Sequence, residues 1–206
     1  MRSHTATLHI SRAAAVNNDL QLMTRVPYEF GQAGSRKIGD EVSSVLTTYA
    51  ATADGYDLFS SDHANLGSAG APGTTEIEEL FSLMGAQQNS AGDYLNYKPR
   101  FILSGPGYAS ILAQLRAAMN AGNDDGLSDG TIVTLIDSRL SGTTKWYALA
   151  DSIFRPIILA TLDGQAAPTF ERVSGPISRD GEFYRSRIDF VVVPGNWKAM
   201  AYNPGA

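Results

Sequence analysis

The fold is decided by the stretch Asp180-Gly181-Glu182-Phe183-Tyr184-Arg185-Ser186-Arg187-Ile188-Asp189-Phe190, which runs on through three valines to Pro194. Successive side chains of a strand point to opposite faces of its sheet. One face would carry Tyr184, Ser186, Ile188, Phe190 and Val192, and the other Arg185, Arg187 and Asp189. The stretch therefore predicts a half-buried strand over 182–193, opened by a turn signal at Asp180-Gly181. A second, short aromatic strand is expected between Trp197 and the end of the chain.

A long helix is predicted before this region, near the N-terminus. Small or apolar residues recur there every four positions, at Phe30, Gly34, Ile38, Val42 and Leu46. Pro27 stands where a first helical position would be, so we expect one helix over 27–49, about 35 Å long at 1.5 Å per residue. Its glycines each weaken the helix by about 1 kcal/mol relative to alanine. We therefore expect packing along its whole length to hold it, with another backbone close to the glycines.

Shorter periodic stretches complete the secondary structure. Residues 5–10 predict a weak strand, and Asn17, Asn18 and Asp19 offer side chains that could cap a short helical turn. A helix should begin at Thr74 or Thr75, where Glu78 completes a capping box, and another is expected over 108–119. Further strands are expected at 99–104, 131–136, 146–149, 155–162 and 169–173, and a polar, glycine-rich loop at 120–130. The fold class is α+β, because the long helix and the strands are segregated.

Composition excludes several classes of function. The 206 residues contain no cysteine, which rules out disulfides, thiolate catalysis and cysteine-bound zinc or iron–sulfur centres. The net charge of −5 offers no general electrostatic case for nucleic-acid binding. No apolar run approaches the roughly 20 residues of a membrane span, and the N-terminus lacks the apolar core of a signal peptide. We expect a soluble protein made inside the cell, without a membrane partner.

The run Ser60, Ser61, Asp62 and His63 contains the residue types of a serine hydrolase. Adjacent positions cannot supply the geometry of a catalytic triad unless distant residues complete it, and no G-x-S-x-G motif surrounds either serine. The favoured interpretation is a hydrogen-bonded loop in which His63 ties two segments together. A hydrolase that uses Ser61 and His63 is kept as the alternative.

Other candidate sites have similarly plain explanations. His4 and His9 would lie on opposite faces of a strand, and the acidic run 123–129 lacks the spacing and the glutamate of a calcium loop. Ser104-Gly105-Pro106-Gly107 lacks a phosphate-binding motif and is expected to be a strand-to-helix turn. Arg185 and Arg187 could touch nucleic acid, but an exposed strand face or a salt bridge explains them equally well. We assign no catalytic, cofactor-binding or metal-binding residue, and no cofactor.

Six stretches, in order along nearly the whole chain, carry a family resemblance. They are Ile10–Leu20, Leu58–Leu66, Tyr94–Leu103, Leu162–Gln165, Asp180–Phe190 and Tyr202–Ala206. Together they resemble the major capsid protein of the Mu-like branch of tailed phages, within the Hong Kong 97-type capsid fold. Ala64 and Asn18 stand where that family would have glycine and aspartate, and Pro194-Gly195 interrupts the final pair of strands.

The resemblance implies a peripheral domain and an axial domain. The peripheral domain would comprise 1–73, with the long spine helix at 27–49, and the C-terminal strands at 161–206; the axial domain would be 74–160. In the family an N-terminal arm and an extended loop precede the spine helix, and only a remnant of that loop could fit in the first nine residues. We therefore expect a monomer or a small ring in dilute solution, not a closed shell.

The implied function is structural and non-enzymatic: a major capsid protein of a phage or prophage icosahedral head. Its partners would be other copies of itself, in pentamers and hexamers, and packaged double-stranded DNA bound without specificity. It would be located in the virion and assembled in the cytoplasm of the bacterial host. A bacterial nanocompartment shell protein of the same fold, which encloses cargo proteins instead of DNA, is the nearest alternative.

Overall fold

The computed structural model describes residues 1–17, 20–48, 51–120, 132–173 and 180–206. These residues form two compact units. Unit 1 comprises 1–42 and 159–193, and unit 2 comprises 43–158 and 194–206. Both units combine helices with a sheet, which confirms the α+β class. None of the described helices is both long and apolar enough to cross a bilayer.

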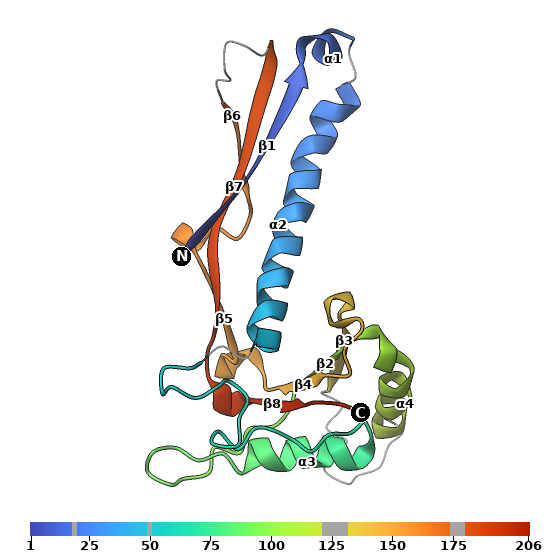
Figure 1. Ribbon diagram of the computed structural model, residues 1–206, viewed down its shortest axis with the longest axis vertical. Coiled ribbons are helices and arrows are strands. Elements are labelled where there is room, and N and C mark those ends of the chain that lie inside the picture. The colour runs from blue at the N-terminus through green and yellow to red at the C-terminus, as the bar shows by residue number, and fades with distance from the viewer. Residues whose placement is uncertain (18–19, 49–50, 121–131, 174–179) are drawn as a thin grey trace. The chain divides into compact units, whose positions relative to one another are not determined.

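The sheet of unit 1 is built around the long strand β7 (Gly181–Pro194). Strand β1 (Arg2–Ser11) pairs antiparallel with it over ten residues, and β6 (Thr169–Val173) also pairs antiparallel with it. Strand β5 (Ile157–Thr161) completes the sheet, as Figure 1 shows. Alternate β7 side chains are buried, namely Ser186, Ile188, Phe190 and Val192. The predicted half-buried strand is therefore confirmed.

Gly181 lies at the start of β7 because β1 approaches it closely. It pairs with Ser11, has a φ of +144°, and a Cβ there would lie 2.2 Å from the carbonyl oxygen of Ile10. A side chain at this position would clash with the β1 backbone. The connection from β6 to β7 includes 174–179, so the hairpin expected at Asp180-Gly181 lies partly outside the described residues.

The long helix is present and continuous, but it begins earlier than predicted. Helix α2 runs over Leu20–Thr48, with Pro27 inside it, so the interpretation of Pro27 as a first helical position was wrong. Proline removes one backbone hydrogen bond from a helix interior, yet the helix continues on both sides of Pro27. Tyr49 lies outside the described residues. Within unit 1, α2 runs alongside β1 and β7 (Figure 1).

A short helix α1 (Arg12–Val16) links β1 to the segment before α2. Its N-cap is Ser11, whose hydroxyl accepts a hydrogen bond from the Ala14 N–H at 3.3 Å. Asn17 is its C-cap, so Asn17 does not start a helix as expected. The other two proposed capping residues, 18 and 19, lie outside the described residues.

The sheet of unit 2 has the strand order β3-β2-β4-β8. Its strands are β2 (Phe101–Ser104), β3 (Val133–Ile136), β4 (Trp146–Leu149) and β8 (Met200–Asn203). Strand β3 runs parallel to β2, and the other neighbours are antiparallel. Short 3₁₀ turns lie at Pro106–Tyr108, Ser138–Leu140, Ser152–Phe154, Leu162–Gly164 and Trp197–Ala199, and the first confirms the strand-to-helix turn expected at 104–107.

Two helices cover one face of the unit 2 sheet. Helix α3 (Thr74–Gly85) lies against β8, and α4 (Ala109–Asn120) lies against β3 (Figure 1). The core between them and the sheet contains Ile77, Leu80, Met84, Ile102, Leu112, Trp146, Ala148 and Ala201. The N-cap of α3 is Gly73, with no side-chain hydrogen bond, so the capping box predicted at Thr75 and Glu78 was wrong.

The two units divide the chain differently from the expected peripheral and axial domains. Residues 43–73 and 194–206 belong to unit 2, whereas the resemblance placed them with the spine helix. The segment 43–73 contains Leu58 and Phe59, and both are buried. Phe59 packs against Tyr147 of β4 and Tyr202 of β8, with ring centroids 5.6 and 5.3 Å apart. Sheet contacts therefore join this segment to unit 2.

Candidate functional site

His63 is the most enclosed ionisable side chain of the candidate loop, with 2% of its surface exposed. Its Nδ1 lies 3.2 Å from the carbonyl oxygen of Leu58, and its Nε2 lies 2.9 Å from Oδ2 of Asp54. The imidazole stacks on the indole of Trp197, with centroids 4.0 Å apart and an angle of 13°. His63 therefore ties the loop to a segment 134 positions later, as the structural interpretation predicted.

Two buried amides surround this histidine and satisfy the loop backbone. The Asn65 Nδ2 donates to the Leu58 carbonyl at 2.9 Å, and its Oδ1 accepts from the Ser60 N–H at 3.1 Å. The Gln87 Nε2 donates to the carbonyl of His63 at 2.9 Å. Buried polar groups need such partners, and a fully satisfied network holds one loop conformation.

The same geometry bears on the hydrolase alternative. The atoms nearest to the two ring nitrogens are a backbone carbonyl and a carboxylate, and neither is a nucleophile. The Ser60 hydroxyl accepts a hydrogen bond from the backbone N–H of His63, at 3.3 Å, and has no contact with the ring. Ser61 is exposed. Nucleophilic catalysis needs a hydroxyl within reach of the base, and this loop does not place one there.

Asp54 was missed by sequence reasoning. Hydrogen bonds from the Thr52 hydroxyl and from His63 lower the pKa of its carboxyl from 3.8 to about 2. Asp54 precedes His63 by nine residues, a separation that corresponds to no helical or strand period. Its contact with His63 depends on how the loop folds back on itself.

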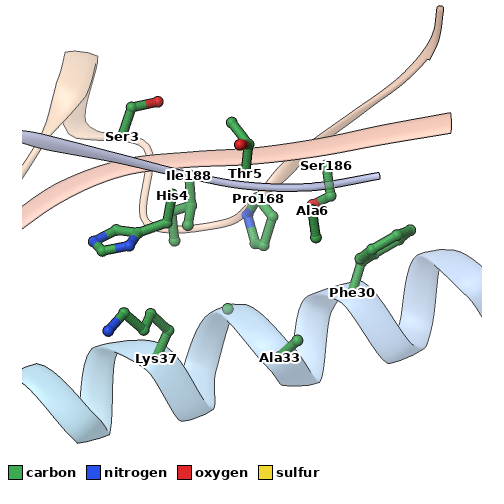
Figure 2. Close-up of a pocket in the computed structure, with 11 residues that line it drawn as sticks. Ser3, His4, Thr5, Ala6, Phe30, Ala33, Lys37, Pro168, Ser186 and Ile188 are labelled. Carbon is green, nitrogen blue, oxygen red and sulfur yellow. The ribbon is translucent and has the colours of Figure 1, made fainter. Parts of the chain in front are cut away.

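A groove of about 480 Å³ lies in unit 1 between α2 and the strands β1 and β7 (Figure 2). Its lining residues are Ser3, His4, Thr5, Ala6, Phe30, Ala33, Gly34, Lys37, Pro168, Ser186 and Ile188. A Cβ on Gly34 would lie 2.6 Å from Cγ of Pro168, so this helix position needs glycine. The neighbour at Gly34 is the ring of Pro168 and not a backbone, and nothing lies within 4 Å of a Cβ on Gly31, so the close backbone approach expected at the helix glycines is not found at these two positions.

The charged groups near this groove form a small cluster around Glu41. Lys37 Nζ lies 2.8 Å from one carboxylate oxygen of Glu41, and Arg2 Nη1 lies 3.9 Å from the other. The hydrogen bond from Lys37 and the nearby positive charges lower the pKa of Glu41. The His4 ring packs on Phe190, with centroids 4.8 Å apart. This arrangement joins the helix to the sheet, and it contains no pair of nucleophile and base.

The other candidate residues are dispersed. His4 packs on Phe190 and His9 on Phe183, on opposite faces of the sheet as predicted. Among the described residues, no group of three histidine, aspartate or glutamate side chains could hold a metal ion. The acidic run 123–129 lies outside the described residues.

The two candidate arginines on β7 lie in ion pairs. Arg185 Nη2 lies 2.7 Å from Glu171 Oε1, and Arg187 Nε lies 3.3 Å from Asp189 Oδ2. Their charges are therefore balanced locally on the exposed strand face.

The second face of the unit 2 sheet carries a feature that sequence reasoning missed. Two rows of side chains cross it: Val133, Phe101, Leu149 and Met200 form the first, and Leu135, Leu103, Tyr147 and Tyr202 the second. The rows are buried at the β4–β8 end and open at the β3 end, where Val133 is 36% and Leu135 42% exposed. Which side chains stand in one row depends on the order and register of the strands, and the periodicity of the sequence does not predict that order.

Comparison with known proteins identifies the family. The sequence model described as "Phage capsid protein" matches residues 3–203. No curated protein sequence matches the chain. Among solved structures, the chain resembles the capsid of Myoviridae phage XM1, with a TM-score of 0.61 and 15% identity, covering 100% of this chain and 73% of that one. The capsid of cyanophage P-SCSP1u gives a TM-score of 0.60 at 10% identity, covering 99% and 72%.

A shell protein of another kind shares the fold. The SrpI encapsulin of Synechococcus elongatus PCC 7942 matches with a TM-score of 0.55 and 11% identity, covering 98% of this chain and 73% of the encapsulin. At these identities the structural likeness establishes the fold. The family model spans almost the whole chain. The chain belongs to the phage capsid protein family.

Proposed function

We propose that this protein is the major capsid protein of a phage or prophage of the Mu-like branch, and that it acts by binding other copies of itself. The observation that carries the proposal is the family match over 3–203, together with a fold shared with two phage capsids. The role is geometric, because one subunit must present the same patches to several neighbours. Packaged double-stranded DNA would be contacted without sequence specificity, and the net charge of −5 offers no general electrostatic attraction to it.

The proposal includes no enzymatic step. Both ring nitrogens of His63 lie against acceptors that hold the loop, and no hydroxyl lies against either one. The histidine stacks on Trp197 and lies almost wholly out of contact with solvent. These contacts favour a structural role for the candidate loop.

We also propose that unit 1, with α2 and β7, serves as the peripheral domain and that unit 2 serves as the axial domain. The long helix and the long strand of unit 1 support the first assignment. The four-stranded sheet with two helices on one face supports the second. Compared with the expected limits of 74–160, the proposed axial domain also contains 43–73 and 194–206.

Self-association is the property that tests the proposal. The purified 206-residue chain would be examined by multi-angle light scattering and electron microscopy over concentrations from micromolar to about 1 mM, where a contact of about −4 kcal/mol is half formed. We expect monomers or small rings at the low end and larger regular oligomers at the high end. A chain that stays monomeric over the whole range would contradict the proposal.

The nanocompartment alternative predicts a different content and a different location. Particles that contain this protein, isolated from the bacterial host and not assembled from the purified chain, should enclose nuclease-protected DNA if they are phage heads, whereas a nanocompartment should enclose a cargo protein. The genes beside this one provide an independent measurement. Portal, terminase and protease genes nearby would support the phage assignment, and a cargo enzyme gene in their place would support the alternative.

A further inference from the structure

The outer edge of β8 is covered by a loop of the same unit, residues 52–67, which we call the covering loop. The Gly67 N–H donates to the Tyr202 carbonyl at 2.7 Å, and the Tyr202 N–H donates to the Asn65 carbonyl at 2.9 Å. Leu66 forms a parallel bridge with Tyr202. A strand edge that is left uncovered offers unpaired backbone groups to other chains. Whatever holds the covering loop therefore decides whether this edge stays closed.

His63 holds the covering loop from inside. Its Nδ1 lies 3.2 Å from the carbonyl oxygen of Leu58, and its Nε2 lies 2.9 Å from Oδ2 of Asp54. A carbonyl oxygen and an ionised carboxylate can only accept hydrogen bonds, whereas a neutral imidazole carries a single N–H. A neutral ring would therefore direct the lone pair of one nitrogen at the lone pair of an oxygen.

The proton between Asp54 and His63 lies on the histidine. Oδ1 of Asp54 accepts hydrogen bonds from the Thr52 hydroxyl and from the Tyr56 N–H, the latter at 3.2 Å. Hydrogen bonds from Thr52 and His63 lower the pKa of Asp54 to about 2. The carboxyl group is therefore ionised at neutral pH, and Nε2 of His63 is the donor of their hydrogen bond.

The Leu58 carbonyl requires a proton on the other ring nitrogen. A carbonyl oxygen has two lone pairs, and this one accepts a hydrogen bond from Asn65 Nδ2 at 2.9 Å. Its second lone pair is left for Nδ1 of His63. With an N–H at both nitrogens, the ring is an imidazolium ion that forms an ion pair with Asp54.

The segments packed around the ring bring one further cation close to it. Trp197 stacks on the imidazole at 4.0 Å, and the face of an indole attracts positive charge. Lys198 Nζ lies 5.2 Å from the centroid of the same indole and donates to the Gln88 carbonyl. The uncharged ring of Tyr56 contacts the imidazole edge-on at 5.9 Å. The indole thus has two cations beside it, and Asp54 is the anion that balances the imidazolium.

We propose that the second proton of His63 acts as a latch: the doubly protonated ring holds the covering loop closed over the outer edge of β8, and loss of that proton releases the loop. This device goes beyond the proposed shell function and does not depend on it, because it follows from contacts within unit 2. When the ring becomes neutral, one of its two contacts turns into a repulsion, so the stabilisation disappears as the pH rises. On the acid side it disappears as the pH falls through about 2, where Asp54 takes up a proton.

The latch has limited strength, and its release is local. The Asp54 side chain is 39% exposed, so water screens the ion pair. Other hydrogen bonds of the loop do not depend on the ring, such as the one from Gln87 Nε2 to the His63 carbonyl at 2.9 Å. We therefore expect the loop to open over β8 while the sheet itself stays folded.

Nitrogen-15 NMR detects the ring protons directly, because nitrogens with and without a proton have well-separated chemical shifts. The three histidines of the chain give three sets of ring signals, which through-bond correlation assigns. We expect both ring nitrogens of His63 to be protonated at pH 7. In Asp54→Asn the second proton should bind about tenfold more weakly, since an opposite charge favours the charged form. Asp57→Asn, which removes an exposed carboxylate of the same loop, is the matched control and should leave proton binding unchanged.

Amide hydrogen exchange measures the opening of the loop. Protection factors, which correct for the intrinsic pH dependence of exchange, are compared for the N–H groups of Gly67 and Tyr202. They should fall about tenfold over the pH range in which His63 loses its second proton, the factor that corresponds to one hydrogen bond to a charged group. The Arg100 N–H, which donates to the Leu149 carbonyl at 2.8 Å in the same unit, is the internal control and should keep its protection.

The same exchange experiment on the variants decides the role of the ion pair. Asp54→Asn should lack the step in protection, and Asp57→Asn should retain it. A ring nitrogen of His63 that carries no proton at pH 7 would overturn the inference. Equal protection of Gly67 and Tyr202 on both sides of the His63 titration, or a step that persists in Asp54→Asn, would overturn it as well. None of these results concerns self-association, so the proposed function is tested separately by light scattering.

Discussion

Replacing His63 by alanine should destabilise unit 2 without removing any activity. The change deletes a ring that is 2% exposed and stacked on Trp197 at 4.0 Å. Aromatic contacts of this kind contribute about 0.5–1.5 kcal/mol, and a buried hydrogen bond contributes about 1 kcal/mol. The space left by the ring adds about 1 kcal/mol. The expected loss in the free energy of unfolding is about 2–4 kcal/mol.

The partners of His63 limit this loss. The Leu58 carbonyl keeps its hydrogen bond from Asn65 Nδ2 at 2.9 Å, so it is not left unsatisfied. The Asp54 side chain is 39% exposed and can bind water in place of the imidazole. Most of the cost therefore comes from packing. His63→Phe, which can keep the stack on Trp197 but not the hydrogen bonds, should lose less stability than His63→Ala.

Urea unfolding, followed by tryptophan fluorescence, would measure these changes. Trp146 and Trp197 are the only tryptophans and both belong to unit 2, so the signal reports that unit. Ser61→Ala is the control, with an expected change below about 0.5 kcal/mol, because Ser61 is exposed. A loss below about 0.5 kcal/mol in His63→Ala would refute the packing argument. Hydrolytic activity of the unmodified protein, or its labelling by a fluorophosphonate, would refute the non-enzymatic assignment if it disappeared in both Ser61→Ala and His63→Ala.

Three other predictions concern unit 2. Hydrogen bonds from Thr52 and His63 lower the pKa of Asp54 from 3.8 to about 2. The contribution of Asp54 to the free energy of unfolding is therefore complete above pH 3.8 and disappears as the pH falls through about 2. When that free energy is measured against pH, the Asp54→Asn variant should lack this dependence. Gly195→Ala should lower the free energy of unfolding in urea by about 1–3 kcal/mol, because its Cβ would lie 2.1 Å from the Arg155 carbonyl oxygen. Gly85→Ala is the control and should be neutral or stabilising, because nothing lies within 4 Å of a Cβ there. Equal effects of the two variants would contradict the close approach at Gly195. Ala64→Gly should raise the melting temperature, because the φ of Ala64 is +47°, in the left-handed region. The backbone strain relieved, about 1–2 kcal/mol, exceeds the entropy cost of glycine, about 0.5–1 kcal/mol. A lower melting temperature would contradict this strain.

The family resemblance anticipated two local features of the backbone. Ala64, which stands where the family has glycine, has a positive φ that glycine adopts without strain. Pro194-Gly195, which interrupts the final strands, lies where the backbone of Arg155 comes within reach of a Cβ. In both cases the departure from the family pattern marks a position where the local backbone restricts the side chain.

Periodicity in the sequence determined the elements and their buried faces. Alternation over 182–193 predicted β7, and the four-residue stripe from Phe30 to Leu46 predicted one continuous helix. These patterns depend only on the geometry of a strand or a helix, which repeats every two or 3.6 residues whatever lies opposite. The absence of cysteine likewise excluded whole classes of chemistry without any structure.

Tertiary structure decided what depends on residues far apart in the chain. Helix α2 begins before Pro27, although local preference placed its start there. His63 meets Asp54 and Trp197 only because the loop and the C-terminal segment pack together. The order β3-β2-β4-β8 places α4 and α3 at opposite edges of the unit 2 sheet. Strand order reflects long-range packing of the whole unit, and no local period in the sequence encodes it.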